Sequence, residues 1–294
     1  MGVAPPSSMS PSSCSSFKEC PLAFRFSYID RLPEPPALWT SKGTLVHRAL
    51  ELLLDRPADE RSPDAAQADL ARARVELAPH PEFADLHLSD AEWEAFDRDA
   101  SALVEKYFQL EDPRTVRPIG LELKLEADLG AADTSSGARV RLRGIIDRLE
   151  LDEHGELVVT DYKTGSVPSE FFEAKSLNGV HMYALLCERM LGRRPARVQL
   201  YYLSKPEAII ATPSDQSITG VERRTTALYS AVRSACERED FRPKPGRLCD
   251  FCTFRPYCPA HGGNPHEAEE LRNQVTGPET GPETMVPAPL PLGA

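Results

Sequence analysis

Two short apolar segments, each ending in an aspartate and separated by a polar turn, constrain the fold of this sequence most. RVRLRGIID ends at Asp147, EHG forms a turn at 153–155, and ELVVTD ends at Asp161. This pattern predicts a β-hairpin. Opposed positions in such a hairpin have residue numbers that add to about 308, so we expect Asp147 and Asp161 to face each other with Cβ atoms ~5 Å apart.

The two aspartates and the lysine that follows them indicate a metal-dependent site. Carboxylates this close repel each other, and a divalent cation with a preference for oxygen ligands, such as Mg²⁺, relieves the repulsion. Lys163 lies two residues after Asp161 and projects from the same face of the strand. Its ammonium group can orient an attacking water or neutralise a phosphate. The alternative is a trio of surface charges on an exposed hairpin.

Two further residues are weaker candidates for the same site. Glu122 lies on the strand predicted at 119–129, where a carboxylate can equally be a solvent-facing charge. His47 lies in the middle of the helix predicted at 44–54, among apolar residues, where a lone histidine is usually structural. Neither residue is assigned to the site by its local pattern alone.

Strands and helices alternate along the rest of the chain, which favours an α/β fold with a mixed central sheet flanked by helices. One domain is expected over 13–262, with a helical insert at about 55–112 and a cysteine-rich region at 240–260. Residues 1–12 and the Pro- and Glu-rich tail 263–294 are expected to be disordered. The predicted helices are 15–29, 44–54, 64–78, 89–110, 169–191 and 215–238, and the predicted strands are 119–129, 138–152, 156–163 and 196–203.

Three cysteines in the segment CDFCTFRPYC, at 249, 252 and 258, have the spacing of a metal or iron–sulfur site. Cys20, which precedes a proline near the start of the domain, is the best candidate for a fourth ligand, and Cys14 is the second. Such a site would join the two ends of the domain. Spacing leaves both zinc and a 4Fe–4S cluster open, because both accept four thiolates.

The net charge of −11 weakens a nucleic-acid interpretation without excluding it. The charge is uneven, since the stretch 139–148 holds four arginines and one aspartate. Neither a secretory signal nor an apolar run long enough to span a membrane is recognisable, so a cytoplasmic protein without a membrane partner is expected. The sequence lacks the G-x-x-x-x-G-K-[ST] loop of a helicase motor.

The motifs CPLAFRF, GTLVH, RGIIDRLE, VVTDYKTG and CDFCTFRPYC, in this order, resemble the RecB-type nuclease family of the PD-(D/E)xK superfamily. The resemblance spans about 13–259 and implies a restriction-endonuclease-like fold. It implies that His47, Asp147 and Asp161 bind Mg²⁺ or Mn²⁺, that Lys163 is catalytic, and that Glu122 belongs to the site. It also favours a 4Fe–4S cluster over zinc; its ligands would be Cys20, Cys249, Cys252 and Cys258.

The sequence departs from the family pattern at one position. The family carries a Gln four residues before the tyrosine that matches Tyr183, and Gly179 stands at that position here. Tyr183 is still expected to be catalytic. Further candidate phosphate contacts, each with ordinary surface charge as the alternative, are Arg141, Arg143 and Arg148.

The resemblance therefore implies a metal-dependent DNA exonuclease in DNA repair or recombination, acting on single strands or ends, with a helicase or repair protein as a partner. A non-catalytic DNA-binding or scaffold subunit that retains the fold and the cluster is the alternative. A zinc-stapled hydrolase of another kind is a third interpretation.

Overall fold

The computed structural model describes residues 2–130, 139–168 and 170–275. Its centre is a five-stranded sheet in the order β1-β2-β3-β4-β5. Strand β3 pairs in parallel with β4, and the other neighbours are antiparallel, so the sheet is mixed as expected. The strands are β1 (Pro118–Leu129), β2 (Val140–Leu151), β3 (Leu157–Lys163), β4 (Arg197–Tyr202) and β5 (Glu207–Ala211).

The hairpin of β2 and β3 has the register expected from the sequence. Arg148 pairs with Thr160 and Leu149 with Val159, so opposed residue numbers add to the same value as predicted. Only the last part of β2 pairs with β3, because the ladder between them covers 148–151 of β2. Asp147 and Asp161 therefore lie where the two strands begin to separate, which leaves room for polar side chains between them.

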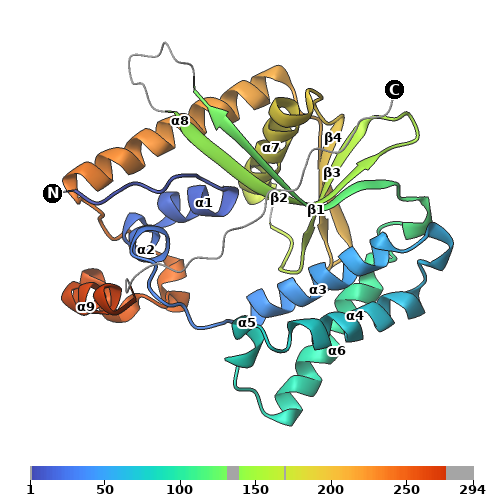
Figure 1. Ribbon diagram of the computed structural model, residues 1–294, viewed down its shortest axis with the longest axis horizontal. Helices are drawn as coiled ribbons and strands as arrows, with labels where there is room; N and C mark the ends of the chain where they lie inside the picture. The colour runs from blue at the N-terminus through green and yellow to red at the C-terminus, as the bar shows by residue number, and fades with distance from the viewer. Residues whose placement is uncertain (1, 131–138, 169, 276–294) are drawn as a thin grey trace.

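Helices cover both faces of the sheet (Figure 1). On one face α7 (Glu170–Leu191) packs on four strands, and α8 (Asp215–Arg238) packs on α7. The buried side chains of α7 and α8 share one apolar core with those of the N-terminal helices α1 (Pro11–Glu19) and α2 (Pro21–Phe24). This core includes Leu142, Ile146 and Val159 from the sheet.

A second apolar core lies on the other face, between the sheet and α3 (Leu38–Asp55). The predicted insert region contributes α4 (Pro63–Leu77), α5 (Pro81–Ala84) and α6 (Asp90–Tyr107), which pack against α3 at the lower right of Figure 1. Among the described residues, no helix combines the length and the apolar character needed to cross a membrane.

The structure corrects the expectation that residues 1–12 are disordered. The amide of Met9 donates to the carbonyl of Arg141 at 2.7 Å, and its carbonyl accepts from the amide of Arg143 at 2.8 Å. Residues 141–143 lie on the part of β2 that β3 leaves unpaired, so its free edge is available to Met9. The Met9 side chain is fully buried, and its burial stabilises this short pairing.

The structure also differs from the sequence interpretation near the C-terminus. The expected tail contains a helix, α9 (Pro265–Val275), which buries Ala268 in the first core. Arg272 of α9 forms an ion pair with Asp30 at 3.4 Å. Residues 276–294, the rest of that tail, lie outside the described residues. Strand β5 had no sequence prediction, because EAIIA is too short to show a clear alternation.

Candidate active site

Helix α3 carries His47 to the end of β3. Leu45, Val46, Ala49 and Leu50 bury the apolar side of the helix, which fixes its rotation against the sheet. Gly43, one turn before His47, allows a close approach: a Cβ there would lie 3.3 Å from Thr164 Oγ1. The G-x-x-x-H spacing thus has a physical reason, since the glycine admits the strand end that the histidine then contacts.

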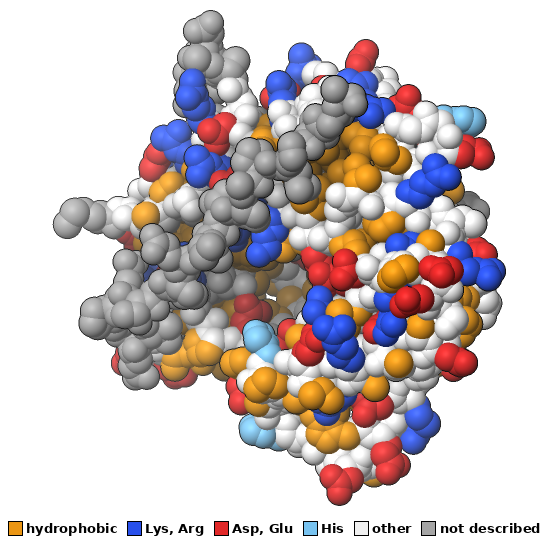
Figure 2. Space-filling model, turned by 45° about the vertical axis from the view of Figure 1, so that its right-hand side comes forward, with side chains coloured by type: hydrophobic (Ala, Val, Ile, Leu, Met, Phe, Trp, Pro, Cys, Tyr) orange, Lys and Arg blue, Asp and Glu red, His pale blue; other side chains and the backbone are white. Residues whose placement is uncertain are grey.

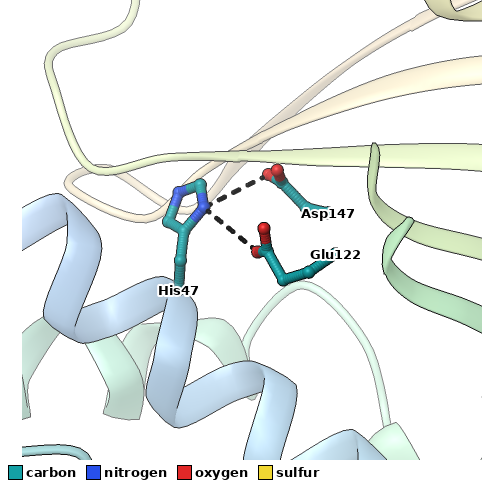
Figure 3. Close-up of side chains that lie close together, drawn as sticks. All are labelled: His47, Glu122 and Asp147. Atoms are coloured by element: carbon teal, nitrogen blue, oxygen red, sulfur yellow. Dashed lines mark ion pairs between the residues drawn. The ribbon is translucent and has the colours of Figure 1, made fainter. Parts of the chain in front are cut away.

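The protonation of His47 follows from its hydrogen bond to a backbone carbonyl. His47 Nε2 lies 3.0 Å from the carbonyl oxygen of Tyr162, and a carbonyl only accepts, so Nε2 carries the proton. Burial lowers the pKa of His47, which favours the neutral ring. The lone pair of Nδ1 then faces the carboxylates of Asp147, 3.5 Å away, and Glu122, 4.0 Å away (Figure 3).

Asp147 lies on β2 and is oriented by the next strand. Its Oδ2 accepts from the amide of Tyr162 at 2.7 Å. Burial and then the charge of Asp161 raise the pKa of Asp147 well above its usual range. Burial, followed by the charges of Glu51 and Asp161, raises the pKa of Glu122 to about 7. Both carboxylates are therefore held where a negative charge is costly without a counter-ion.

Glu122 lies on β1 in an unusual backbone conformation. Its φ is 45°, in the left-handed region that residues other than glycine rarely adopt. Residues two apart on a regular strand share a face, yet Leu121 packs against the second core and Leu123 against the first. The conformation of Glu122 thus lets β1 change faces at this point and directs the carboxylate toward His47 and Asp147.

Among the described residues, one group of His, Cys, Asp and Glu side chains has ligand atoms that all lie within 4.8 Å of one another: His47, Glu122 and Asp147. Three oxygen and nitrogen donors that converge where negative charge is costly fit a divalent cation, which would take the place of the protons that the raised carboxyl pKa values favour. The sequence interpretation assigned the metal to His47, Asp147 and Asp161. The structure brings the first two together and adds Glu122, while Asp161 lies beside them.

Asp161 is buried and paired with the lysine of its own strand. Its carboxylate forms an ion pair with Lys163, and the hydroxyl of Tyr183 donates a hydrogen bond to it. Burial disfavours the charged lysine, but the charges of Asp161 and Asp147 outweigh that cost and raise the pKa of Lys163. The lysine therefore stays protonated beside the carboxylate cluster.

Tyr183 can reach Asp161 because it packs on Gly144 of β2, which has no side chain. A Cβ on Gly144 would lie 2.9 Å from Tyr183 Cε1 and 3.0 Å from Leu186 Cδ1, so only glycine admits α7 this closely. Gly179, where the family carries Gln, brings no side chain to the site. Tyr183, the residue of the family's Gln–Tyr pattern that this sequence retains, lies beside Asp161.

The arginines proposed as phosphate contacts have different surroundings. Arg148 is fully buried and forms ion pairs with Glu111 and Glu150, so the structure contradicts its assignment as a phosphate contact. Arg141 forms ion pairs with Glu126 and Asp128 on the exposed face of β1. Alternation on a strand could not reveal that Arg148 points into the protein, because the partner Glu111 comes from a distant segment.

The four predicted cluster cysteines come from the two ends of the described chain. Burial raises the pKa of the Cys252 thiol, and charges on Cys20, Cys249 and Cys258 would raise it further, so these thiols lie near one another. The amide of Lys244 lies 3.5 Å from Cys20 Sγ, and the amide of Gly246 lies 3.3 Å from Cys249 Sγ. Cys14, the second candidate for the fourth ligand, is instead buried in the first core.

The mixed sheet thus brings a histidine, clustered carboxylates and a D-x-K lysine to one strand end, where they could hold a divalent cation beside a fixed positive charge. The family model described as PD-(D/E)XK nuclease superfamily matches residues 8–259. The chain belongs to this superfamily.

Individual relatives are more distant. The chain is 24% identical over 290 residues to the Gene 69 protein of Mycobacterium phage L5, covering 84% of this chain and 94% of the relative. Among solved structures, a protein from Eubacterium rectale named "Putative exonuclease" shares 11% identity at a TM-score of 0.45, covering 84% of this chain and 93% of that one. The crystal structure of SSO0001 shares 14% identity at a TM-score of 0.37, covering 75% and 85%.

The left-handed conformation of Glu122 leads to a prediction about stability. Glu122→Gly is expected to raise the free energy of unfolding in EDTA by about 1 kcal/mol, because glycine adopts this φ without strain. Chemical denaturation of both proteins measures the difference. Glu126→Gly, four residues along on β1 and exposed, is the control, and there glycine should destabilise by about 0.5–1 kcal/mol. Equal destabilisation by both changes would contradict strain at Glu122.

Proposed function

We propose that this nuclease-superfamily protein is a Mg²⁺- or Mn²⁺-dependent DNA exonuclease that hydrolyses phosphodiester bonds during DNA repair or recombination. One observation carries the proposal. The neutral His47 and the carboxylates of Glu122 and Asp147 converge within 4.8 Å, next to the paired Asp161 and Lys163. This donor set fits a divalent metal ion and has a fixed cation beside it.

Each residue has a proposed task. His47, Glu122 and Asp147 would hold the ion, with Asp161 at the edge of the group. When bound, such an ion lowers the pKa of a water ligand and places positive charge beside the phosphate. Lys163, kept protonated by its carboxylate neighbours, would bind a phosphate oxygen or orient the attacking water. Tyr183 holds the Asp161 carboxylate in place through its hydroxyl.

The elements that carry His47 and Glu122 also line a polar cleft. A cleft of about 730 Å³ is lined by residues from the second half of α3 and the start of β1, including Arg48 and Leu121, and not by His47 or Glu122 themselves. Four arginines and three carboxylates line this cleft, so its charge is mixed. Figure 2 shows basic and acidic side chains interspersed beside a hollow in the middle of the face that it draws. We propose that a separate helicase or repair protein separates the two DNA strands.

We further propose that Cys20, Cys249, Cys252 and Cys258 hold a 4Fe–4S cluster with a structural role. Backbone amides directed at two of the sulfurs would stabilise thiolate ligands. Zinc, the alternative, has bonds of ~2.3 Å to sulfur and would hold the sulfurs ~3.8 Å apart. The choice of the cluster over zinc rests on the resemblance of CDFCTFRPYC to the cysteine motif of the iron–sulfur nucleases.

Purified protein, prepared without oxygen, can be assayed on end-labelled linear single- and double-stranded DNA and on circular single strands. We expect degradation of linear DNA with Mg²⁺ or Mn²⁺, none in EDTA, and none of the circles. Asp161→Ala should abolish the activity, because it removes the partner of Lys163 and Tyr183. Cleaved circles would contradict an exonuclease, and failure to cut any substrate with either metal would favour the non-catalytic scaffold.

A further inference from the structure

Arg148 is the largest fully buried side chain of the described residues, and its guanidinium group lies at the centre of a polar network. It forms an ion pair with Glu111, which follows α6, and donates to Glu150 at 3.1 Å and Thr160 at 3.0 Å. Its Nη1 also donates to the hydroxyl of Tyr162 at 2.8 Å. The network therefore joins the helical segment at 55–112 to the strand that ends at the candidate site.

Tyr162 connects this network to two of the three candidate metal ligands. Its amide donates to Asp147 at 2.7 Å, and its carbonyl accepts from His47 at 3.0 Å. The carbonyl determines which nitrogen of His47 is protonated, and the amide fixes the direction of the Asp147 carboxylate. One residue thus orients both ligands through its backbone. Its side chain lies in the second core, where its ring also meets the ring of His47 edge-on, with centroids 6.1 Å apart.

The Tyr162 ring is held in the second core by other aromatic residues. It meets the ring of Tyr107 edge-on, with centroids 5.9 Å apart, and lies 6.4 Å from that of Tyr201. These apolar contacts limit where the ring can lie, and the hydrogen bond from Arg148 fixes the position of its hydroxyl end. If the ring moved toward or away from the sheet, the amide and the carbonyl of Tyr162 would move with it.

We propose that Arg148 is a positioning residue for the metal site, acting through Tyr162. The inference rests on the proposed function, because it concerns the same ligands. By holding the Tyr162 hydroxyl, Arg148 keeps the backbone of β3 where it orients His47 and Asp147 together. The helical segment thereby contributes to metal binding through Glu111, which pairs with Arg148, although none of the three candidate ligands lies on it.

The most specific test removes one hydroxyl group. Tyr162→Phe deletes the acceptor for Arg148 and leaves the guanidinium with Glu111, Glu150 and Thr160, so the fold keeps its buried ion pairs. Tyr107→Phe is the matched control. The Tyr107 hydroxyl donates to Glu111 at 2.7 Å in the same network, but Tyr107 makes no hydrogen bond to the candidate ligands.

Mn²⁺ affinity, measured by titration calorimetry without DNA, is the readout. We expect Tyr162→Phe to weaken Mn²⁺ binding about tenfold, as loss of support behind metal ligands typically does. Tyr107→Phe should change it less than about twofold. Arg148→Met should weaken Mn²⁺ binding at least as much as Tyr162→Phe does. Adding Tyr162→Phe to Arg148→Met should have little further effect, because both changes break the same connection.

Equal Mn²⁺ affinities of Tyr162→Phe and Tyr107→Phe would overturn the inference, as would additive effects of the Tyr162 and Arg148 changes. The DNA assay separates this result from the proposed function. Wild-type protein that binds Mn²⁺ but cuts no DNA would contradict the exonuclease and leave the affinity comparison decisive. Wild-type protein that binds no Mn²⁺ would overturn both.

Discussion

Asp147→Asn is expected to lower metal-dependent DNA cleavage by roughly 10²–10³-fold, the loss typical when one charge-stabilising group is removed from an active site. The asparagine oxygen can still accept the bond from the Tyr162 amide, so the backbone around the site should be unchanged. The loss therefore reports on the negative charge of Asp147. Cleavage of end-labelled DNA at saturating Mn²⁺ measures it.

The same variant should be at least as stable as the wild type in EDTA at neutral pH. Burial and the charge of Asp161 raise the pKa of Asp147, so its favourable contribution exists only at acidic pH. That contribution is lost as the pH rises through the raised pKa, above which the ionised carboxylate destabilises the fold. Thermal melting should show this gain, together with a smaller Mn²⁺-induced increase in Tm.

Asp128→Asn is a suitable control for this experiment. Asp128 lies on β1, is exposed, and pairs with Arg141 away from the candidate ligands. Its replacement should leave cleavage and the Mn²⁺-induced shift near wild-type values. If the Asp147→Asn protein kept more than a tenth of the wild-type activity, Asp147 would not be a ligand of the metal ion.

Cys20→Ser is expected to have the largest effect on stability. A cluster that joins Cys20 to the C-terminal cysteines would close a loop of more than 200 residues, for which chain entropy gives a stabilisation of about 5 kcal/mol. A loss of that size would lower Tm by roughly 10–20 °C in a protein of this length. The visible absorbance of the cluster should disappear as well, and both are measured on anaerobic protein.

Cys14→Ala is the matched control, because Cys14 lies six residues away but inside the first core. It should keep the absorbance and lose only the packing of one small side chain. Full absorbance in Cys20→Ser would exclude Cys20 as a ligand. A colourless wild-type protein that contains zinc would contradict the iron–sulfur assignment.

Much of the fold could be predicted because its signals are local. The hairpin followed from two apolar runs and a glycine turn, and its register followed from counting. The helices followed from apolar spacing. The contacts of Met9 could not be predicted, since they depend on an edge of β2 that β3 leaves free. A single buried side chain has no periodicity to indicate it.

The candidate site was predicted less completely. Asp147 followed from the hairpin pattern and His47 from the resemblance, and the two lie together in the structure. Glu122 had only a weak signal, because a carboxylate on a strand looks like a surface charge unless its left-handed backbone is known. The contacts by which Tyr162 orients His47 and Asp147 were not predicted, because they come from backbone atoms that every residue possesses.

The contacts between the chain ends also bear on how the protein is made. The amide of Val3 bonds to the carbonyl of Cys236, and Lys244 donates to Cys20 and to the carbonyl of Lys18. At about 5–20 residues per second, a ribosome needs roughly 10–50 s after Cys20 to reach Cys258. Throughout that interval the N-terminal helices lack these partners. The helices α1 and α2 are thus synthesised well before the segments that complete their packing.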